Sequence, residues 1–228
     1  SSRMADAPRA LIVRTAGTNC DAELCRAFEL AGARPELVHI RALMADPGRL
    51  DACDLVGFPG GFSYGDDVAS GRILAVQIRE RLYEPFRRAA ERGVAMIGVC
   101  NGFQVLVQVG LLPGPDAGEP WPIDAAPTPR VALTENVPPR FQDRWVGVRP
   151  EPSSSCVWTR GLLEHTDPDA LMLPIAHGEG RFVARDGATL AALELHGQVA
   201  LRYTDNPNGS MGDVAGICDA TGRIFGLM

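Results

Sequence analysis

A cysteine between two glycines, directly after an apolar run, is the feature that most restricts the fold of this chain. Residues 98–104 read GVCNGFQ, and they follow the apolar residues 94–97. Gly98 and Gly102 are small enough to allow a tight turn that holds the Cys100 side chain above the edge of a sheet. This is the form of a nucleophile elbow, which needs a strand before the cysteine and a helix after it. The alternative is a small buried cysteine in a tight turn.

The first half of the chain repeats this order of strand and helix. Apolar runs of strand length predict strands at residues 10–14, 37–40, 54–58 and 94–99. Apolar residues at helical spacing predict helices at residues 21–31, 73–92 and 101–109, with Pro85 kinking or dividing the second of them. This rhythm is typical of an α/β fold with a mostly parallel central sheet and helices on both of its faces.

The second half favours strands. Six prolines between Leu112 and Arg130 predict a loop, for which we expect no role beyond a flexible connection. Beta-prone runs then predict strands at residues 130–137, 144–151, 181–184 and 199–205, and residues 213–228 are typical of a hairpin. We expect residues 10–228 to form a single domain and residues 1–9 to be a tail or an expression scar.

Composition narrows the possible partners. The chain has 228 residues with 22 basic and 28 acidic side chains, a net charge of −6, and the basic residues are scattered. This balance argues against nucleic acid or an anionic membrane as partner. No apolar stretch approaches the roughly 20 residues of a membrane-spanning helix, and no signal peptide opens the chain. We therefore expect a soluble protein of the cytoplasm.

The six cysteines indicate reduced thiols. They form no CxxC pair and no cysteine and histidine spacing of a zinc site, so we expect no metal in this chain. No phosphate-binding loop and no GxGxxG after the first strand are present, which leaves little support for a nucleotide site. Most cysteines of this kind are small buried apolar residues.

Cys100 is the exception, because two features of its surroundings suit a nucleophile. The helix predicted to begin at Asn101 points its N–H groups and positive dipole end at the sulfur, which favours thiolate over thiol. The stretch FPGGFSYGDD at residues 58–67 follows the preceding strand. Backbone N–H groups of Gly60 and Gly61, with that of Asn101, would form an oxyanion hole at the same edge of the sheet.

The segment PIAHGEGRF at residues 174–182 offers a second, weaker candidate. His177 and Glu179 lie two residues apart, so on an extended segment they would share one face and could act as base and orienting carboxylate. A contact with a partner or a purely local role in a loop is equally compatible with the pattern. Asp66 and Asp67, at the end of the FPGGFSYGDD stretch, are candidates to cap the following helix.

Taken together, the motifs resemble the class I glutamine amidotransferase family, which has a flavodoxin-like fold. Within it, they resemble the glutaminase subunits that serve a synthetase of purine biosynthesis. The resemblance rests on GTNCD (17–21), FPGGFSYGDD (58–67), GVCNGFQ (98–104), LTEN (133–136) with RFQDRW (140–145), PIAHGEGRF (174–182), and NPNGS (206–210) with DVAGIC (213–218). It implies hydrolysis of glutamine to glutamate and ammonia, and transfer of the ammonia to the synthetase.

The resemblance also implies partners and roles. The synthetase subunit is expected to bind ATP and magnesium, with no cofactor in this chain, and a small accessory subunit is expected in the same complex. Cys100 matches the nucleophile that forms a glutamyl thioester, Gly60 or Gly61 with Asn101 matches the oxyanion hole, and Gln104 matches a residue of the glutamine pocket. His177 and Glu179 lie outside the family's catalytic motif, so we assign them a secondary or interface position.

The family's histidine base and its glutamate lie in a PHPE motif after a strand that ends like GLM. The sequence ends at Gly226, Leu227 and Met228, so we expect that pair in residues beyond Met228. Two rival hypotheses remain open at this point. One is a docking module that binds the synthetase without catalysis, and the other is a different cysteine hydrolase or a redox-sensing thiol on the same fold.

Overall fold

The computed structural model describes residues 6–15, 20–60, 68–167 and 171–228, with side chains in the helix that begins at residue 68 described from residue 75. The chain divides into two compact units, one of residues 1–111 with 123–126 and the other of residues 112–122 with 127–228. The expected single domain over residues 10–228 stays a prediction.

The first unit is built on a parallel sheet. Its strands lie in the order β2 (Arg34–His39), β1 (Arg9–Arg14), β3 (Leu55–Phe58) and β4 (Ala95–Val99). Ile12, Val56 and Met96 on successive strands are each fully buried. Strands of parallel sheets are apolar along their length because helices cover both faces, and this explains the continuous apolar runs of the sequence.

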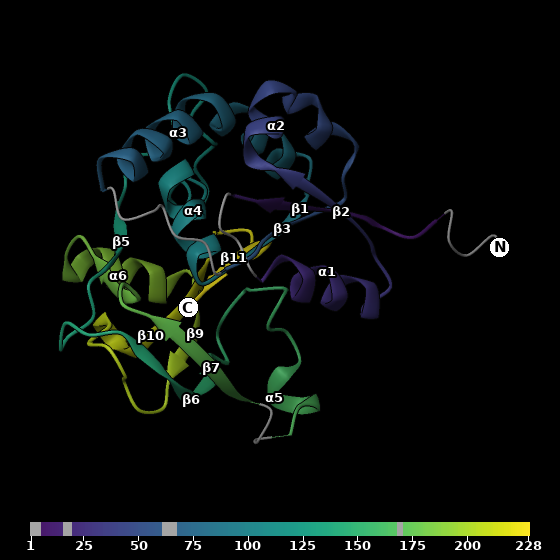
Figure 1. Ribbon diagram of the computed structural model, residues 1–228. Coiled ribbons are helices and arrows are strands. Elements are labelled where there is room, and N and C mark those ends of the chain that lie inside the picture. Colours follow the sequence, from purple (N-terminus) through teal and green to yellow (C-terminus); the bar gives the residue numbers. More distant parts are fainter. Residues whose placement is uncertain (1–5, 16–19, 61–67, 168–170) are drawn as a thin grey trace. The chain divides into compact units, whose positions relative to one another are not determined.

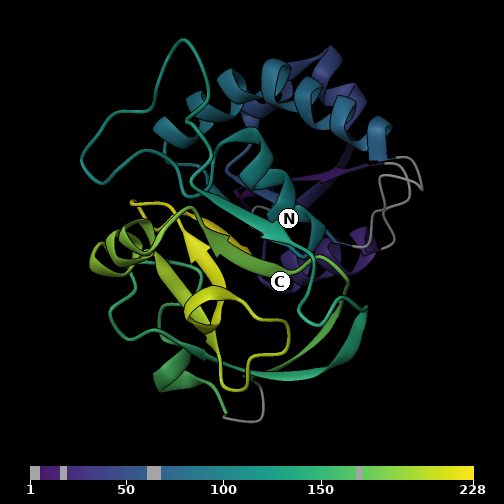
Figure 2. The ribbon, with the colours of Figure 1, turned by 90° about the vertical axis from the view of Figure 1, so that its left-hand side faces the viewer.

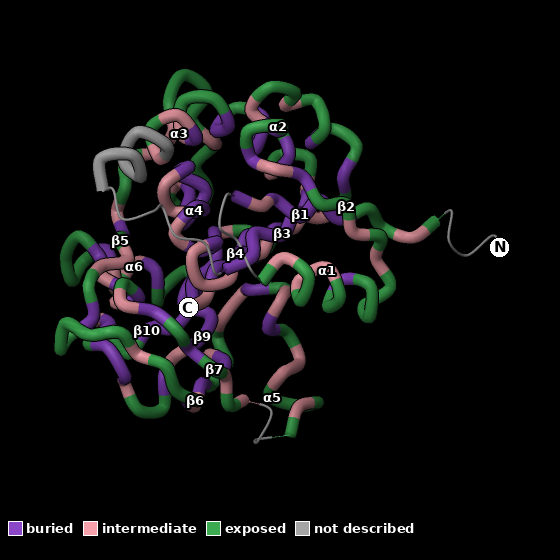
Figure 3. Tube along the Cα trace, viewed as in Figure 1, coloured by how far each residue is buried: buried purple, intermediate pink, exposed green. Residues whose placement is uncertain are grey.

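Helices cover both faces of that sheet. Figure 1 shows α1 (Asp21–Leu30) on one side of β1 and β3, and α3 (Val68–Glu91) with α4 (Asn101–Val109) on the other. Leu24 and Phe28 of α1 pack against Gly57 of β3, where an added Cβ would lie 3.0 Å from each side chain. Figure 3 shows the strands largely buried and the outer sides of these helices exposed. The predicted arrangement of this half is therefore confirmed.

Two local predictions in this unit need correction. Ile40, predicted as the end of a strand, is the first residue of α2 (Ile40–Ala45), because His39 Nδ1 accepts a hydrogen bond from the Arg41 N–H at 3.1 Å and starts the helix. A 3-10 helix, Pro47–Ala52, follows. Pro85 does not divide its helix, since α3 runs through it as one element.

The physical reason why α3 survives Pro85 is packing. Proline in a helix interior costs roughly 3 kcal/mol through a lost hydrogen bond and a steric clash. Leu82 and Phe86, on either side of it, are fully buried, and the Phe86 ring lies 5.4 Å from the Phe58 ring between centroids. Burying two such side chains contributes more than the proline costs.

The second unit contains an antiparallel sheet. Its strand order is β11 (Ile224–Leu227), β10 (Val214–Cys218), β9 (Val199–Tyr203), β6 (Gln142–Pro150) and β7 (Met172–His177). Figure 2 shows β10 and β11 as the hairpin at the yellow end of the chain, as predicted. A separate pair is formed by β5 (Val131–Thr134) and β8 (Arg181–Ala184).

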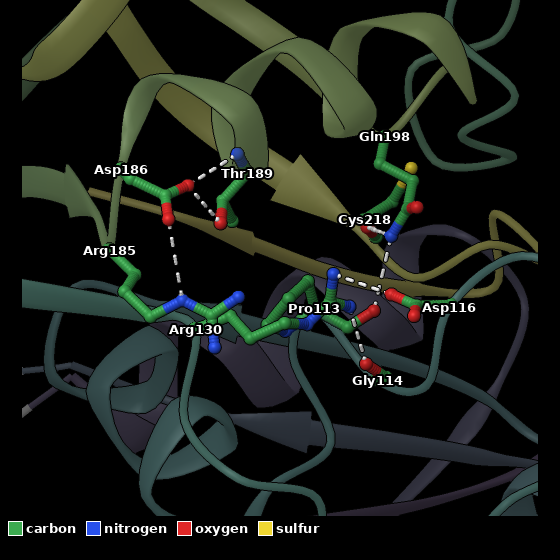
Figure 4. Close-up of polar contacts among 9 residues, drawn as sticks. All are labelled: Pro113, Gly114, Asp116, Arg130, Arg185, Asp186, Thr189, Gln198 and Cys218. Carbon is green, nitrogen blue, oxygen red and sulfur yellow. Dashed lines mark hydrogen bonds and ion pairs between the residues drawn. The ribbon is translucent and has the colours of Figure 1, made fainter.

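Three elements of this unit were not predicted. They are β7, the short helix α5 (Leu162–His165) and the helix α6 (Gly187–Leu195), and a 3-10 helix spans Met211–Asp213. The start of α6 does carry a capping signal, because Asp186 Oδ1 accepts hydrogen bonds from the N–H and the hydroxyl of Thr189 at 2.7 Å each (Figure 4). Pro174 inside β7 is a poor strand former, which obscured that strand.

The proline-rich segment has no helix or strand over residues 112–130, as predicted. It is not merely a loose connection, because its first part is tied down (Figure 4). The Arg130 guanidinium donates to the Gly114 carbonyl at 2.8 Å and pairs with Asp116 at 2.9 Å. Gln198 Nε2 donates to the Pro113 carbonyl at 3.1 Å.

Within the described ranges, no helix combines the length and the apolar character needed to cross a membrane.

Candidate active site

Cys100 occupies a strained turn between β4 and α4. The strand ends at Val99, the helix begins at Asn101, and the cysteine between them has φ 55° and ψ −115°. A residue with a side chain at positive φ in this region carries a conformational cost of about 1–3 kcal/mol, and residues with such strain are found mainly at functional sites. This backbone geometry is that of a nucleophile elbow, which directs the side chain away from the sheet.

The two flanking glycines are required by close packing. A Cβ on Gly98 would lie 2.5 Å from the Gly102 carbonyl oxygen and 2.7 Å from Leu106 Cδ1. A Cβ on Gly102 would run into the carbonyl oxygen of Phe58 and lie 2.7 Å from its carbonyl carbon. The first turn of α4 therefore rests on the backbone at the end of β3, and any larger residue would push the elbow out of position.

Gly60 lies beside the cysteine. A Cβ on Gly60 would be 2.8 Å from Cys100 Cβ and 3.0 Å from the Val99 carbonyl oxygen. The register of the sheet explains the approach, since Phe58 of β3 pairs with Gly98 of β4 and both strands end at the same edge. In a flavodoxin-type strand order, ligands bind at this carboxyl edge.

The structure thus brings together three residues of the predicted site. Asn101 provides the first N–H of α4, in the turn where a helix has no acceptors of its own for its N–H groups. Gly60 lies next to Cys100 on the side of β3. Gly61 of the predicted oxyanion hole, and the predicted capping residues Asp66 and Asp67, lie outside the described residues.

A short chain of side-chain hydrogen bonds leads from the thiol along the helix. Cys100 Sγ donates to Asn101 Oδ1 at 3.7 Å, and Asn101 Nδ2 donates to Gln104 Oε1 at 3.1 Å. All three side chains are half-buried. Gln104 therefore lies one turn along α4 from the thiol, and its role in binding glutamine stays a prediction.

His177 and Glu179 do not share a face. His177 is the last residue of β7 and is 5% exposed, whereas Glu179 is exposed in the turn that follows. The extended conformation assumed for this segment ends at His177, because Asn136 pulls the backbone into a turn. Its Nδ2 donates to the His177 carbonyl at 2.9 Å and its Oδ1 accepts from the Gly180 N–H at 3.0 Å.

Asn136 is thus a residue whose role the sequence did not reveal, although the LTEN motif contained it. It is 1% exposed and also donates to the Arg140 carbonyl at 3.1 Å, so these hydrogen bonds all join its side chain to backbone groups. A Cβ on Gly180 would penetrate the ring of His177, and this explains the glycine. The HxE spacing here builds a rigid turn and does not assemble a base with its orienting carboxylate.

The imidazole of His177 makes folding stability depend on pH. Neither ring nitrogen has a hydrogen-bond partner among the described residues, and burial lowers the pKa of His177. The unfolded chain, with an ordinary histidine pKa of about 6.5, binds the proton more readily than the folded chain. The stabilising contribution of the neutral ring is therefore complete above pH ~6.5 and is lost as the pH falls toward the lowered pKa.

We expect His177→Phe, which keeps a flat ring against Gly180, to remove this part of the pH dependence. The difference in free energy of unfolding between variant and wild type should change below pH ~6.5 by at most about 1.4 kcal/mol per pH unit. This limit is the slope that follows when unfolding takes up one proton. Urea unfolding at several pH values measures it. A difference that stays constant across this range would show that His177 is not the titrating group.

The described part of the chain shows no cluster of three or more histidine, cysteine or acidic side chains that would suit a metal ion. None of the six cysteines, which all lie within the described ranges, forms a disulfide.

A parallel sheet in the order β2-β1-β3-β4, with a strained thiol and a glycine turn at its carboxyl edge, defines an α/β protein of the flavodoxin type with a cysteine nucleophile elbow. The CobB/CobQ-like glutamine amidotransferase domain matches residues 7–228. The chain belongs to this glutamine amidotransferase family.

Relatives of known name agree with this assignment. The chain is 43% identical over 227 residues to the phosphoribosylformylglycinamidine synthase subunit PurQ of Dehalococcoides mccartyi, covering 96% of this chain and 83% of the relative. It is 38% identical to the subunit of the same name from Treponema denticola, covering 97% of this chain and 86% of that one.

A solved structure supports the fold as well. The structure of PurLQS from Thermotoga maritima contains a chain that superposes with a TM-score of 0.72 at 33% identity, covering 97% of this chain and 86% of that one. A glutamine amidotransferase from the same organism matches with a TM-score of 0.52 at 13% identity, which supports the fold alone. The predicted flavodoxin-like glutamine amidotransferase fold is therefore confirmed, and the chain is a glutamine amidotransferase.

Proposed function

We propose that this chain is the glutaminase subunit of phosphoribosylformylglycinamidine synthase, which hydrolyses glutamine and delivers the ammonia to a synthetase subunit for purine biosynthesis. Relatives that are 38–43% identical over nearly the whole chain are named as a subunit of phosphoribosylformylglycinamidine synthase. The observation that carries the proposal is the conformation of Cys100, held at φ 55° beside Gly60 at the edge where this fold binds ligands. A structural cysteine has no need of that strain.

In the proposed reaction, the thiolate of Cys100 attacks the side-chain amide carbon of glutamine. The N–H of Asn101, with that of Gly60 or Gly61, donates to the oxygen that becomes negative in the tetrahedral intermediate. Collapse of the intermediate breaks the carbon–nitrogen bond. The departing nitrogen takes up a proton and leaves as ammonia, and a glutamyl thioester remains on Cys100. Water then attacks the thioester carbon, which releases glutamate and restores the thiol.

Roles in substrate binding and assembly are proposed on the same grounds. Gln104 lies on the elbow helix one turn beyond the thiol and is assigned to the glutamine pocket. The partner is the synthetase subunit that the names of the relatives imply. From the family resemblance, we propose that this subunit binds ATP, magnesium and formylglycinamide ribonucleotide, and that this chain holds no cofactor. A small accessory subunit is proposed as a further member of the complex, and the cytoplasm as its location.

Reconstitution tests this function. The full-length chain is mixed with the purified synthetase and accessory subunits, ATP, magnesium and formylglycinamide ribonucleotide, and product is measured with either glutamine or ammonium chloride as nitrogen source. We expect glutamine-dependent synthesis only when this chain is present, with one glutamate formed per product. The same mixture without this chain, supplied with ammonium chloride, is the control for an active synthetase. Glutamine that supports no synthesis beside an active synthetase would refute the proposal.

A further inference from the structure

The second unit exposes one face of the strands β6 and β7, which Figure 1 shows side by side. Val146 and Val148 of β6 and Ile175 of β7 are buried, so the residues that alternate with them point to the opposite face of the sheet. We call this opposite face the outer face. It presents Asp143, Trp145, Gly147 and Arg149 from β6 and Met172, Pro174 and Ala176 from β7.

The outer face is mostly apolar, although it is open to solvent. Trp145 is 65% exposed and Met172 is 42% exposed, and Pro174 is exposed beside them. The register of the two strands explains how they meet, since Trp145 pairs with Pro174 and Gly147 pairs with Met172. Exposed tryptophan and methionine side chains gathered in one patch are typical of surfaces that bind another protein.

Gly147 makes the outer face flat beside Trp145. A Cβ on Gly147 would press against Thr204 Oγ1 and lie 3.4 Å from Met172 Sδ. The methionine sulfur and the threonine hydroxyl therefore lie close to the backbone at this position, whereas the Trp145 ring projects from the face two residues away. The outer face thus combines a projecting aromatic ring with a glycine position next to it that has room for such a ring.

The free edge of β7 is poorly suited to adding a further strand. The Gly147 carbonyl accepts a hydrogen bond from the Thr204 N–H at 3.0 Å, so Gly147 and, by alternation, Trp145 turn their backbone groups toward β9. Their partners on β7, Met172 and Pro174, therefore turn theirs away from β6, toward the edge. Pro174 has no N–H to donate there. A binding partner thus covers the outer face more readily than it extends the sheet.

The outer face also carries two exposed charges that have no partner in the described part of the chain. Asp143 and Arg149 lie on either side of Trp145, and no ion pair within the described ranges includes either of them. Six residues of strand separate them by about 20 Å, which is too far for them to pair with each other. Arg202, the neighbour of Arg149 on β9, is already paired with Glu151 at 2.7 Å.

We propose that a second copy of this chain binds to the outer face and forms a symmetric dimer. The two-fold axis lies between the two outer faces beside Val146 and runs across the strands, so that β6 of one copy lies antiparallel over β6 of the other. Asp143 of each copy then faces Arg149 of the other copy, and Trp145 faces Gly147. Each contact occurs twice, and both charges gain a partner.

One position of the axis satisfies the charges and the apolar side chains together. The two charged residues are each three positions from Val146, and Trp145 and Gly147 are each one position from it. The axis that pairs the charges therefore also lays the Trp145 ring over the glycine position, beside the Met172 sulfur, where sulfur and aromatic ring attract each other. Sheets packed face to face lie about 10 Å apart, a gap that these side chains fill.

The symmetry of the two charges favours a second copy over other partners. The outer face has one acid and one base at equal distances from its centre, so it is complementary in charge to itself. Nucleic acid or an anionic membrane needs an excess of basic residues, which neither this face nor the chain, with a net charge of −6, provides. For a different protein, nothing would require the acid and the base to lie at equal distances from the centre.

The size of the outer face makes the dimer weak. Two strands of six residues cover roughly 20 by 10 Å. Two such faces bury well below the roughly 1,200 Å² of total surface that stable complexes bury. We expect a dissociation constant on the order of 100 µM, so the dimer forms in concentrated solution.

Sedimentation velocity of the full-length chain tests this inference. Between roughly 5 and 500 µM, the wild type should pass from monomer to dimer. Trp145→Ala should raise the dissociation constant at least about tenfold, because it removes the ring at the centre of the contact. Asp143→Arg should raise it to a similar extent, because it sets like charges against each other across the interface.

A charge swap tests the position of the axis. Asp143→Arg combined with Arg149→Asp should return the dissociation constant to within about threefold of wild type, because each copy again presents opposite charges to the other. Glu119→Arg is the matched control, since it makes the same change in net charge at an exposed acid outside the sheet and should dimerise like wild type. Circular dichroism checks that each variant is folded.

The wild-type measurement alone is able to overturn the proposal. A chain that stays monomeric up to about 500 µM forms no such dimer. A dimer that Trp145→Ala leaves unchanged uses another surface. If the charge swap is no better than Asp143→Arg alone, the two charges do not meet and the axis is wrong. A monomeric wild type that loses binding to the purified synthetase subunit on Trp145→Ala would assign the outer face to the synthetase instead.

Discussion

Replacing Cys100 with alanine is expected to abolish release of glutamate from glutamine, lowering the rate by about a thousandfold or more, while ammonia-dependent synthesis by the partner subunit continues. The thioester cannot form without the sulfur, and the donors at Gly60 and Asn101 alone leave only a small residual rate. Alanine has the same preference against φ 55° as cysteine, so the elbow should keep its conformation and stability.

Two further variants make this experiment specific. Cys25→Ala removes a half-buried thiol of α1 and should retain full activity. Cys100→Gly should be as inactive as Cys100→Ala, yet more stable toward urea by about 1 kcal/mol, because glycine adopts positive φ without strain. Glutamate release is measured by a coupled assay and stability by urea unfolding. Glutamine hydrolysis at a rate near that of wild type in Cys100→Ala would mean that another group is the nucleophile.

A covalent probe distinguishes the proposed chemistry from its rivals. An electrophilic glutamine analogue should label Cys100 and no other cysteine, and saturation with glutamine should protect it, because the thiol and the oxyanion donors act together on an amide carbon. A docking module without catalysis would show no protection. A cysteine hydrolase of another specificity would show label on Cys100 that glutamine does not reduce.

The strands and helices of the first unit were predictable because their buried sides are so regular. Continuous apolar runs at β1, β3 and β4 fit a parallel sheet that is covered on both faces, and the glycines at 98 and 102 located the elbow. Ile40 was misplaced since a cap by the His39 ring is not among the usual capping residues. The local sequence also overstated how strongly Pro85 disrupts its helix, because tertiary packing outweighs the energetic cost of this proline.

The candidate site was also predictable only where its residues lie next to a strand end in the sequence. Residues adjacent in sequence to a strand end, Gly60, Cys100 and Asn101, were found together because parallel strands end at one edge. The expectation that His177 and Glu179 would share one face was wrong, since the turn after β7 depends on hydrogen bonds with Asn136, 41 residues away from His177 in sequence.

The second large effect is expected for Gly102→Ala, a change of one methyl group on the elbow helix. That methyl group would collide with the Phe58 carbonyl oxygen and lie 2.8 Å from Phe58 Cβ, and all of these atoms are fully buried. Neither side can yield easily, because Phe58 is part of β3 and packs on Phe86. We expect a loss of about 3 kcal/mol or more in the free energy of unfolding, measured with urea.

Gly187→Ala is the matched control, because Gly187 also lies in the first turn of a helix, α6, and an added Cβ there meets no atom within 4 Å. It should leave stability unchanged or raise it by up to about 1 kcal/mol, since alanine favours the helix. If Gly102→Ala were as stable as this control, the tight contact between α4 and β3 would be wrong.

The same substitution also tests whether the elbow is positioned by packing. To relieve the collision, α4 must move away from the end of β3, and Cys100 would move with the helix because its carbonyl accepts hydrogen bonds from the Phe103 and Gln104 N–H groups. The cysteine would then separate from Gly60, so glutamate release should fall by more than about a hundredfold even at temperatures where the variant is fully folded. Full activity in the folded variant would contradict this prediction. It would show that the donors of the oxyanion hole move together with the thiol, and that the close approach of Gly60 to Cys100 does not set the rate.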